Sequence, residues 1–153
     1  MIKKNPYLIL LIVVLFVNIS YSQDTIQSNR RNMAVNVFID CYWCDMNFIR
    51  REIPYVNYVR DTRDAHLYIR ETQQTSGSGG REYTYIFNGQ KQFEGMNDTL
   101  VYHAGPDDTR DQRREGRTKM MKMGLMRYVA RTPLYKEISI NSSSIDADSE
   151  IVD

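Results

Sequence analysis

The sequence has little of what identifies several large classes of protein. Its 153 residues include two Cys and two His, and Lys+Arg exceed Asp+Glu by only one. The absence of a basic surplus argues against a dedicated nucleic-acid binder, because phosphate contacts need positive charge. No internal repeat is visible. The length and an apolar content of 42% fit one globular domain rather than two.

Long apolar runs are also missing after residue 22, so we expect no transmembrane helix in the rest of the chain. The first 22 residues differ. Lys3 and Lys4 precede an apolar run of eleven residues, 7–17, which the short step Ser20-Tyr21-Ser22 follows. This is the pattern of a secretory signal peptide. A retained anchor is the alternative, but eleven residues rise only about 16 Å as a helix, against a ~30 Å hydrocarbon core.

The export pattern divides the chain into four expected parts. These are a signal peptide at 1–22, a flexible lead-in at 23–32, an α+β domain at 33–140 and a loose acidic tail at 141–153. Residues 23–153 carry 18 basic and 19 acidic side chains. We expect them in an oxidising compartment, where disulfides persist.

Apolar periodicity predicts the secondary structure of the domain. Alternation predicts strands at 33–40, 65–72, 83–87, 99–103 and 135–140, and helical spacing predicts helices at 45–53 and 108–131. The segment 55–59 fits either a kinked continuation of the first helix or a short strand. The order β-α-(β)-β-β-β-α-β predicts an α+β fold with a mixed sheet, an antiparallel meander and two helices on one face.

The helix expected at 108–131 carries the clearest packing signal. Its apolar stripe consists of Thr118, Met121, Leu125, Tyr128 and Val129. Two glycines in it, Gly116 and Gly124, would each weaken an isolated helix by about 1 kcal/mol, so we expect close backbone packing there.

Four methionines of the same segment, Met120, Met121, Met123 and Met126, are expected to fill the core rather than a partner face. The glycine-rich stretch 77–80 is expected to form a hairpin turn. It lacks the following Lys-Ser/Thr and the helix of a phosphate-binding loop.

The motif Cys41-Tyr42-Trp43-Cys44 is the sharpest local feature. It lies between a predicted strand and a predicted helix. A short structural disulfide is the favoured interpretation. A redox-active pair is an alternative, because a helix N-terminus favours a thiolate, and free thiols are a third. A thioredoxin-like fold would place a βαβ unit before the motif, and Asp45 stands where haem attachment requires a His.

A metal site would need Cys41, Cys44, His66 and His103 together. The two His are 37 residues apart on separate predicted strands, so we predict neither a metal nor a cofactor. No catalytic residue is predicted either. Among the carboxylates, Glu52, Asp61 and Asp64 have no partner at a spacing that indicates catalysis.

Eleven Tyr remain to be explained, and Tyr68, Tyr83 and Tyr85 lie on predicted strands. An exposed aromatic stripe would suit peptide or glycan contact. Half-buried sheet positions explain the same residues equally well.

Four segments carry a resemblance to a known family: 37–61, Gly77 to Thr84, Phe93-Glu94-Gly95-Met96-Asn97-Asp98-Thr99-Leu100 and 124–133. They resemble an uncharacterised family of exported proteins from Bacteroidota and related bacteria, over about residues 35–140. The resemblance implies an N-terminal periplasmic domain, which in relatives precedes an outer-membrane β-barrel, and it implies no catalytic residues. Only 20 residues follow Pro133, too few for eight membrane strands of about 9–11 residues, so we expect no barrel here.

The order of elements is also similar to the N-terminal domain of TolB, a protein-interaction module, by analogy alone. We therefore predict an exported, non-catalytic domain in the periplasm, at or near the outer membrane. Its expected partner is an envelope protein or outer-membrane component, held by an exposed sheet edge and the Tyr-bearing strand face. The alternative is a thiol-disulfide oxidoreductase that uses Cys41 and Cys44.

Overall fold

A computed structural model describes residues 29, 31–77 and 79–139. The expected signal peptide at 1–22 and acidic tail at 141–153 lie outside them. Of the expected flexible lead-in, the described residues Asn29, Arg31 and Asn32 are helical. None of the helices in the described ranges combines the length and apolar character that a membrane crossing requires.

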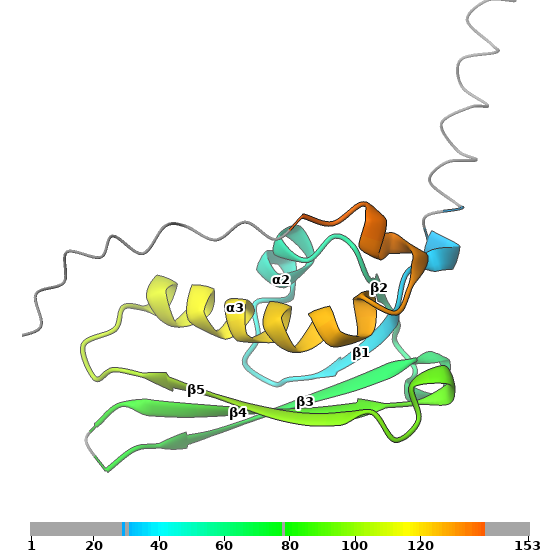
Figure 1. Cartoon of the computed structure of the whole chain (residues 1–153). Coiled ribbons are helices and arrows are strands. Elements are labelled where there is room, and N and C mark those ends of the chain that lie inside the picture. The colour runs from blue at the N-terminus through cyan, green and yellow to red at the C-terminus, as the bar shows by residue number, and fades with distance from the viewer. Residues whose placement is uncertain (1–28, 30, 78, 140–153) are drawn as a thin grey trace, which may run out of the picture.

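The domain is an α+β fold with a mixed sheet and two main helices, as predicted, and the sheet has five strands. The strands are β1 (Asn36–Asp40), β2 (Asn57–Tyr58), β3 (Leu67–Thr75), β4 (Arg81–Gly89) and β5 (Asn97–Ala104), and the helices are α2 (Met46–Glu52) and α3 (Arg110–Val129). The sheet order is β2-β1-β3-β4-β5. β1 runs parallel to β2 and β3, whereas β3, β4 and β5 form the predicted antiparallel meander. Figure 1 shows α2 and α3 on the same face of the sheet.

The stripe predicted for α3 is the face that this helix buries against the sheet. Its two glycines allow the close approach. A Cβ at Gly124 would lie 2.1 Å from Cζ of Phe87, and one at Gly116 would lie 2.2 Å from Oη of Tyr102. The expectation that the methionines fill the core is confirmed for Met121, which is 1% exposed, but not for Met123, which is 59% exposed.

The last predicted strand, 135–140, is wrong over its described residues. A 3-10 helix occupies Pro133–Lys136, no strand follows up to residue 139, and Ile140 lies outside the described residues. The backbone N–H groups of Tyr135 and Glu137 donate to Thr132 and Leu134 within the turn, so they are not available to a strand ladder. The ambiguous segment 55–59 contributes the short strand β2.

Of the two interpretations of the strand tyrosines, the exposed aromatic stripe is wrong for two of the three residues. Tyr83 and Tyr85 are 3% and 0% exposed and belong to the core between sheet and helices. Their alternation along β4 places them on the helix-covered side. Tyr68 instead stacks on Phe38, with 5.8 Å between ring centroids.

Candidate functional site

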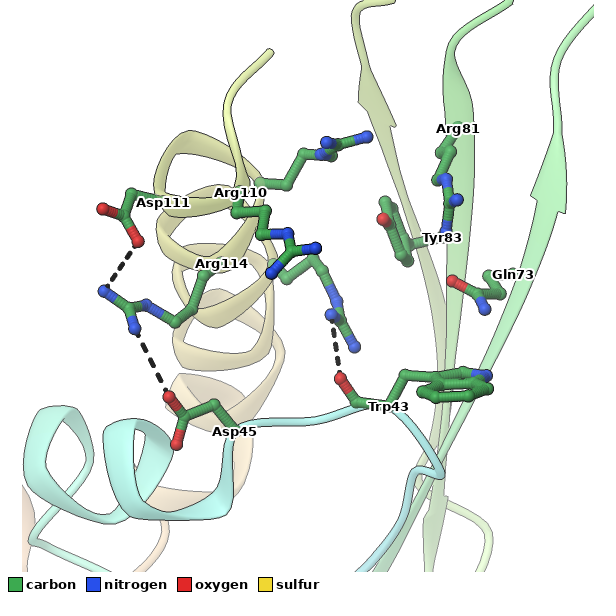
Figure 2. Close-up of a pocket in the computed structure, with 10 residues that line it drawn as sticks. Trp43, Asp45, Gln73, Arg81, Tyr83, Arg110, Asp111 and Arg114 are labelled. Atoms are coloured by element: carbon green, nitrogen blue, oxygen red, sulfur yellow. Dashed lines mark hydrogen bonds and ion pairs between the residues drawn. The ribbon is translucent and has the colours of Figure 1, made fainter.

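A disulfide joins Cys41 and Cys44 between the end of β1 and the start of α2. Asp45 follows it and caps α2, since its side chain accepts a hydrogen bond from the Phe48 N–H at 3.0 Å. The closed loop leaves Trp43 66% exposed and Tyr42 86% exposed. Figure 2 shows Trp43 standing beside Gln73 of the sheet. The disulfide thus holds two neighbouring aromatic rings at the surface.

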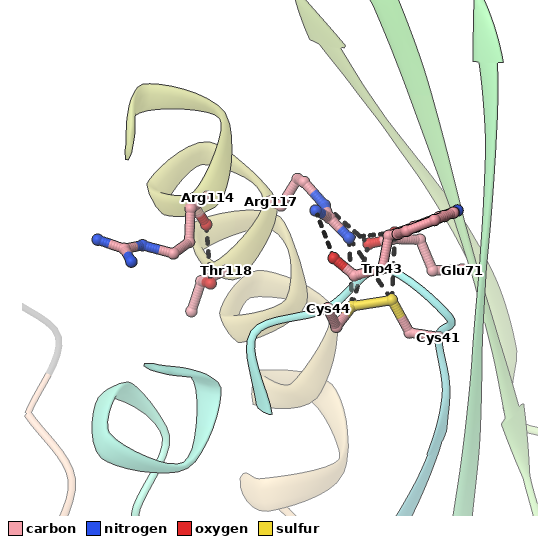
Figure 3. The surroundings of a disulfide bond; sticks show 7 residues. All are labelled: Cys41, Trp43, Cys44, Glu71, Arg114, Arg117 and Thr118. Atoms are coloured by element: carbon pink, nitrogen blue, oxygen red, sulfur yellow. Dashed lines mark hydrogen bonds and ion pairs between the residues drawn. A yellow bond between two sulfur atoms is a disulfide. The ribbon is translucent and has the colours of Figure 1, made fainter. Parts of the chain in front are cut away.

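A buried ion pair lies against the disulfide (Figure 3). Glu71 comes from β3 and Arg117 from α3, and their side chains are 4% and 15% exposed. The guanidinium donates two hydrogen bonds to the carboxylate, one of them from Nε at 3.2 Å. Its Nη1 also donates to the Trp43 carbonyl oxygen at 3.3 Å. The pair therefore connects the sheet, the long helix and the disulfide loop.

Both partners of the ion pair also contact the sulfur atoms. Nη2 of Arg117 lies 3.5 Å from Sγ of Cys41 and 3.3 Å from Sγ of Cys44. The Glu71 carboxylate oxygens lie 3.3 Å and 3.7 Å from the same two atoms. Burial opposes the charge of Arg117, but the hydrogen bond and charge of Glu71 outweigh it and raise the Arg117 pKa. A permanent cation therefore adjoins the disulfide.

Tyr85 extends this cluster into the core. Burial, with the Glu71 charge adding to it, raises the pKa of the Tyr85 hydroxyl. The hydroxyl has no hydrogen-bond partner among the described residues. Its environment keeps it neutral and makes it a poor site for proton exchange with solvent.

The four candidate metal ligands are not assembled. Within the described residues, the one group close enough to hold a metal ion is Cys41, Cys44 and Glu71. Its sulfurs are bonded to each other and so offer no thiolate, and the Arg117 guanidinium occupies the neighbouring space. His66 instead accepts a hydrogen bond from the Asn36 N–H on Nδ1.

Two of the other carboxylates that the sequence singled out form ion pairs at the surface. Glu52 pairs with Lys122 at 2.9 Å, and Asp61 pairs with Arg63 at 2.6 Å. These contacts are ordinary surface ion pairs, which contribute little to stability.

A groove of about 700 Å³ opens beside the disulfide loop (Figure 2). Its walls are the first turns of α3, the strands β3 and β4, and the loop that carries Trp43. The lining residues are Trp43, Asp45, Gln73, Arg81, Tyr83, Arg110, Asp111, Arg113, Arg114 and Arg117. Five arginines thus meet only two carboxylates in the lining.

Two of the five arginines have acidic partners. Arg114 pairs with Asp45 at 3.3 Å and with Asp111 at 3.0 Å, and Arg117 pairs with Glu71. The hydrogen bond from the Phe48 N–H is the largest effect that lowers the pKa of the Asp45 carboxyl, and the hydrogen bond and charge of Arg114 lower it further. The Asp45 carboxyl therefore stays charged.

The other three, Arg81, Arg110 and Arg113, form no ion pair with any acidic side chain of the described part. The groove therefore has an uncompensated positive charge beside an exposed tryptophan.

The sequence alone did not identify this groove. Arg110 and Arg113 alternate with acidic residues along the chain, and Arg81 is about thirty positions away. Only the packing of α3 on β4 brings the three together. The exposed pair Tyr42 and Trp43 was visible inside the Cys motif, but their exposure was not predicted.

No protein-family model matches the chain, and a search of curated proteins finds no significant match. The resemblance to exported proteins of Bacteroidota therefore stays a prediction.

Proposed function

We propose that the chain is an exported, non-catalytic interaction domain that binds an acidic partner in the groove beside Trp43. One observation carries the proposal: three arginines without acidic partners line the same groove as an exposed tryptophan on a disulfide-closed loop. Trp and Arg are the residue types most enriched at the energetic centres of protein interfaces. The guanidinium fork also matches a carboxylate better than an ammonium does.

The cellular location is part of the same proposal. The export pattern of residues 1–22 and the disulfide both favour an oxidising compartment, for which we propose the periplasm at or near the outer membrane. The resemblance to exported bacterial proteins supports an envelope partner. Fractionation followed by N-terminal sequencing tests the location. A chain that begins at Gln23 in the periplasmic fraction is expected, and the unprocessed chain in the cytosol would contradict it.

The binding test uses Trp43, the only tryptophan of the chain, as its reporter. We expect poly-L-glutamate to change the tryptophan emission and poly-L-lysine to leave it unchanged. The double variant Arg110→Gln/Arg113→Gln should bind poly-L-glutamate at least about tenfold more weakly, because two charge-assisted contacts are lost.

The matched control is Arg131→Gln, an exposed arginine beyond the opposite end of α3. It should bind as tightly as the wild-type chain. The proposal is refuted if poly-L-glutamate gives no response, or if the groove variant and the Arg131 control bind it equally.

A second candidate function is thiol-disulfide exchange, which the Arg117 contacts to both sulfurs favour. In the reduced protein this cation would stabilise a thiolate at Cys41 or Cys44. That thiolate would attack a partner disulfide and release one partner thiolate. The second cysteine would then break the mixed disulfide, so that two electrons pass to the partner and the Cys41–Cys44 bond forms. An external dithiol would have to reduce it again.

A redox titration tests this candidate. A potential within the oxidoreductase range, about −120 to −270 mV, together with loss of exchange in both Cys41→Ser and Cys44→Ser, would support it. A potential below about −300 mV would mark a structural bond.

A further inference from the structure

One edge of the sheet is unpaired next to the groove. β3 has nine residues, but β1 pairs with it only from Leu67 to Arg70. After Asp40 the chain leaves the sheet for the disulfide loop and α2. The second half of β3 therefore has β4 on one side and no strand of the described part on the other.

The hydrogen-bond pattern identifies the residues whose main chain faces that open side. The Ser76 N–H donates to the Gly80 carbonyl oxygen at 2.9 Å. In an antiparallel pair, the bonded residues recur at every second position, so the even-numbered residues of β3 turn their N–H and C=O groups toward β4. Gln73 and Thr75 consequently turn theirs away from β4, where β1 has already ended.

This open edge adjoins the groove. Gln73 lines the groove together with Trp43 (Figure 2), and both Gln73 and Thr75 are exposed. A strand laid along the edge would continue the line of β1 past the point where β1 leaves the sheet. Its side chains would alternate between the groove and the opposite face of the sheet.

We infer that the partner presents an extended acidic segment, which adds to the sheet as a strand at Gln73 and Thr75. The inference rests on the proposed function and specifies its ligand. Main-chain hydrogen bonds to β3 would supply part of the affinity. Acidic side chains at every second position would reach the unpaired Arg81 and Arg110, and Trp43 would cover the segment. Charge complementarity with the groove argues for this occupant.

The test uses a capped hexapeptide, Glu-Thr-Glu-Thr-Glu-Thr, whose binding changes the emission of Trp43. Two further peptides are N-methylated, one at its Glu residues and the other at its Thr residues. Both retain the charge of the parent peptide, but in a bound strand only one of the two sets directs its N–H groups at β3. We expect one methylated peptide to bind at least about tenfold more weakly and the other to bind within about twofold of the parent.

A protein variant checks the same edge from the other side. Gln73→Pro removes a donor that β4 does not use, and proline is tolerated at sheet edges. We expect it to weaken the hexapeptide about as much as the unfavourable methylation does. Thermal unfolding verifies that the variant is folded, and the methylated peptides test the inference independently if it is not.

The outcomes separate this inference from the proposed function. If poly-L-glutamate binds but the two methylated peptides behave alike, or the hexapeptide does not bind, strand addition is overturned while the groove remains an acidic-partner site. If neither ligand binds, both fail. A variant in which Asp146, Asp148 and Glu150 are neutralised tests whether the chain's own tail occupies the edge. If its Trp43 emission differs from that of the wild-type chain, the edge is assigned to the tail and a partner segment is overturned. Dimerisation that the hexapeptide dissociates would assign it to a second copy, with the same consequence.

Discussion

Two glycines of α3 allow a sharp test of how the helix packs on the sheet. In Gly124→Ala the new methyl group would lie 2.1 Å from Cζ of Phe87, whereas carbon atoms in contact are about 3.5–4.0 Å apart. Phe87 is fully buried, and protein interiors are close-packed, so its ring is expected to yield little. In Gly116→Ala the methyl group would meet the hydroxyl end of Tyr102, which is only partly buried on the edge strand β5. The same substitution therefore meets a fixed neighbour at one site and a movable one at the other.

The magnitudes follow from opposing effects. Alanine favours the helix over glycine by about 1 kcal/mol at either site. Overpacking a core costs about 1–3 kcal/mol, and the large overlap with Phe87 places Gly124→Ala in the upper part of that range. We expect Gly124→Ala to lower the free energy of unfolding by about 1–2 kcal/mol, and Tm by roughly 5–15 °C. Gly116→Ala should be within about 0.5 kcal/mol of wild type, or more stable.

Urea denaturation of both variants measures the difference. Phe87→Leu supplies a further control, because it removes the ring atoms that the new methyl group meets. The double variant Gly124→Ala/Phe87→Leu should lose less free energy of unfolding than the sum of the losses in the two single variants. A Gly124→Ala protein as stable as Gly116→Ala, or strict additivity with Phe87→Leu, would refute the packing argument.

Three further predictions concern the disulfide, the buried ion pair and a partly buried tyrosine elsewhere in the domain. Because its loop spans only four residues, replacing Cys41 and Cys44 by Ser should lower the free energy of unfolding by about 2 kcal/mol or less, and a larger loss in urea denaturation would contradict this. Arg117→Met should lower the free energy of unfolding by about 3–5 kcal/mol, because it leaves the Glu71 charge buried and unpaired. The double variant with Glu71→Leu should lose less, and a double-mutant cycle from urea denaturation measures the difference. Burial raises the pKa of Tyr55 to about 12 from 10.0. The stability that this shift contributes is complete below pH 10 and is lost as the pH rises to 12. Alkaline absorbance titration of the wild-type chain and of Tyr55→Phe measures the pKa.

Local patterns predicted most of the elements but not how the chain ends. The stripe on α3 repeats at helical spacing over about three turns, and alternation marks β3, β4 and β5, so these elements follow from periodicity. Residues 135–140 also alternate, yet they follow Pro133 and Thr132, which begin a turn that satisfies its own backbone groups. A short alternating segment does not by itself provide a neighbouring strand.

The candidate site was predictable only where it is local. The Cys41–Cys44 spacing indicated a disulfide, since two cysteines three positions apart can approach each other within one turn. The contacts that define the rest of the site are distant in sequence: Glu71 and Arg117 are 46 residues apart, and Trp43 and Arg117 are 74 apart. The sequence around a charged residue on a strand does not indicate which helix residue will pair with it, because that pairing depends on how the helix packs on the sheet.

The same helix placement links the core of the fold to its surface. The glycines of α3 let the helix approach β4 and β5 closely. That approach delivers Arg117 to the back of the disulfide loop and Arg113 to the groove. Because the disulfide closes so short a loop, it restricts the unfolded chain little, and its main effect is to fix the loop that carries Trp43. Reduction of the disulfide should therefore weaken the emission change of Trp43 on binding acidic peptides, while the free energy of unfolding falls by only about 2 kcal/mol or less.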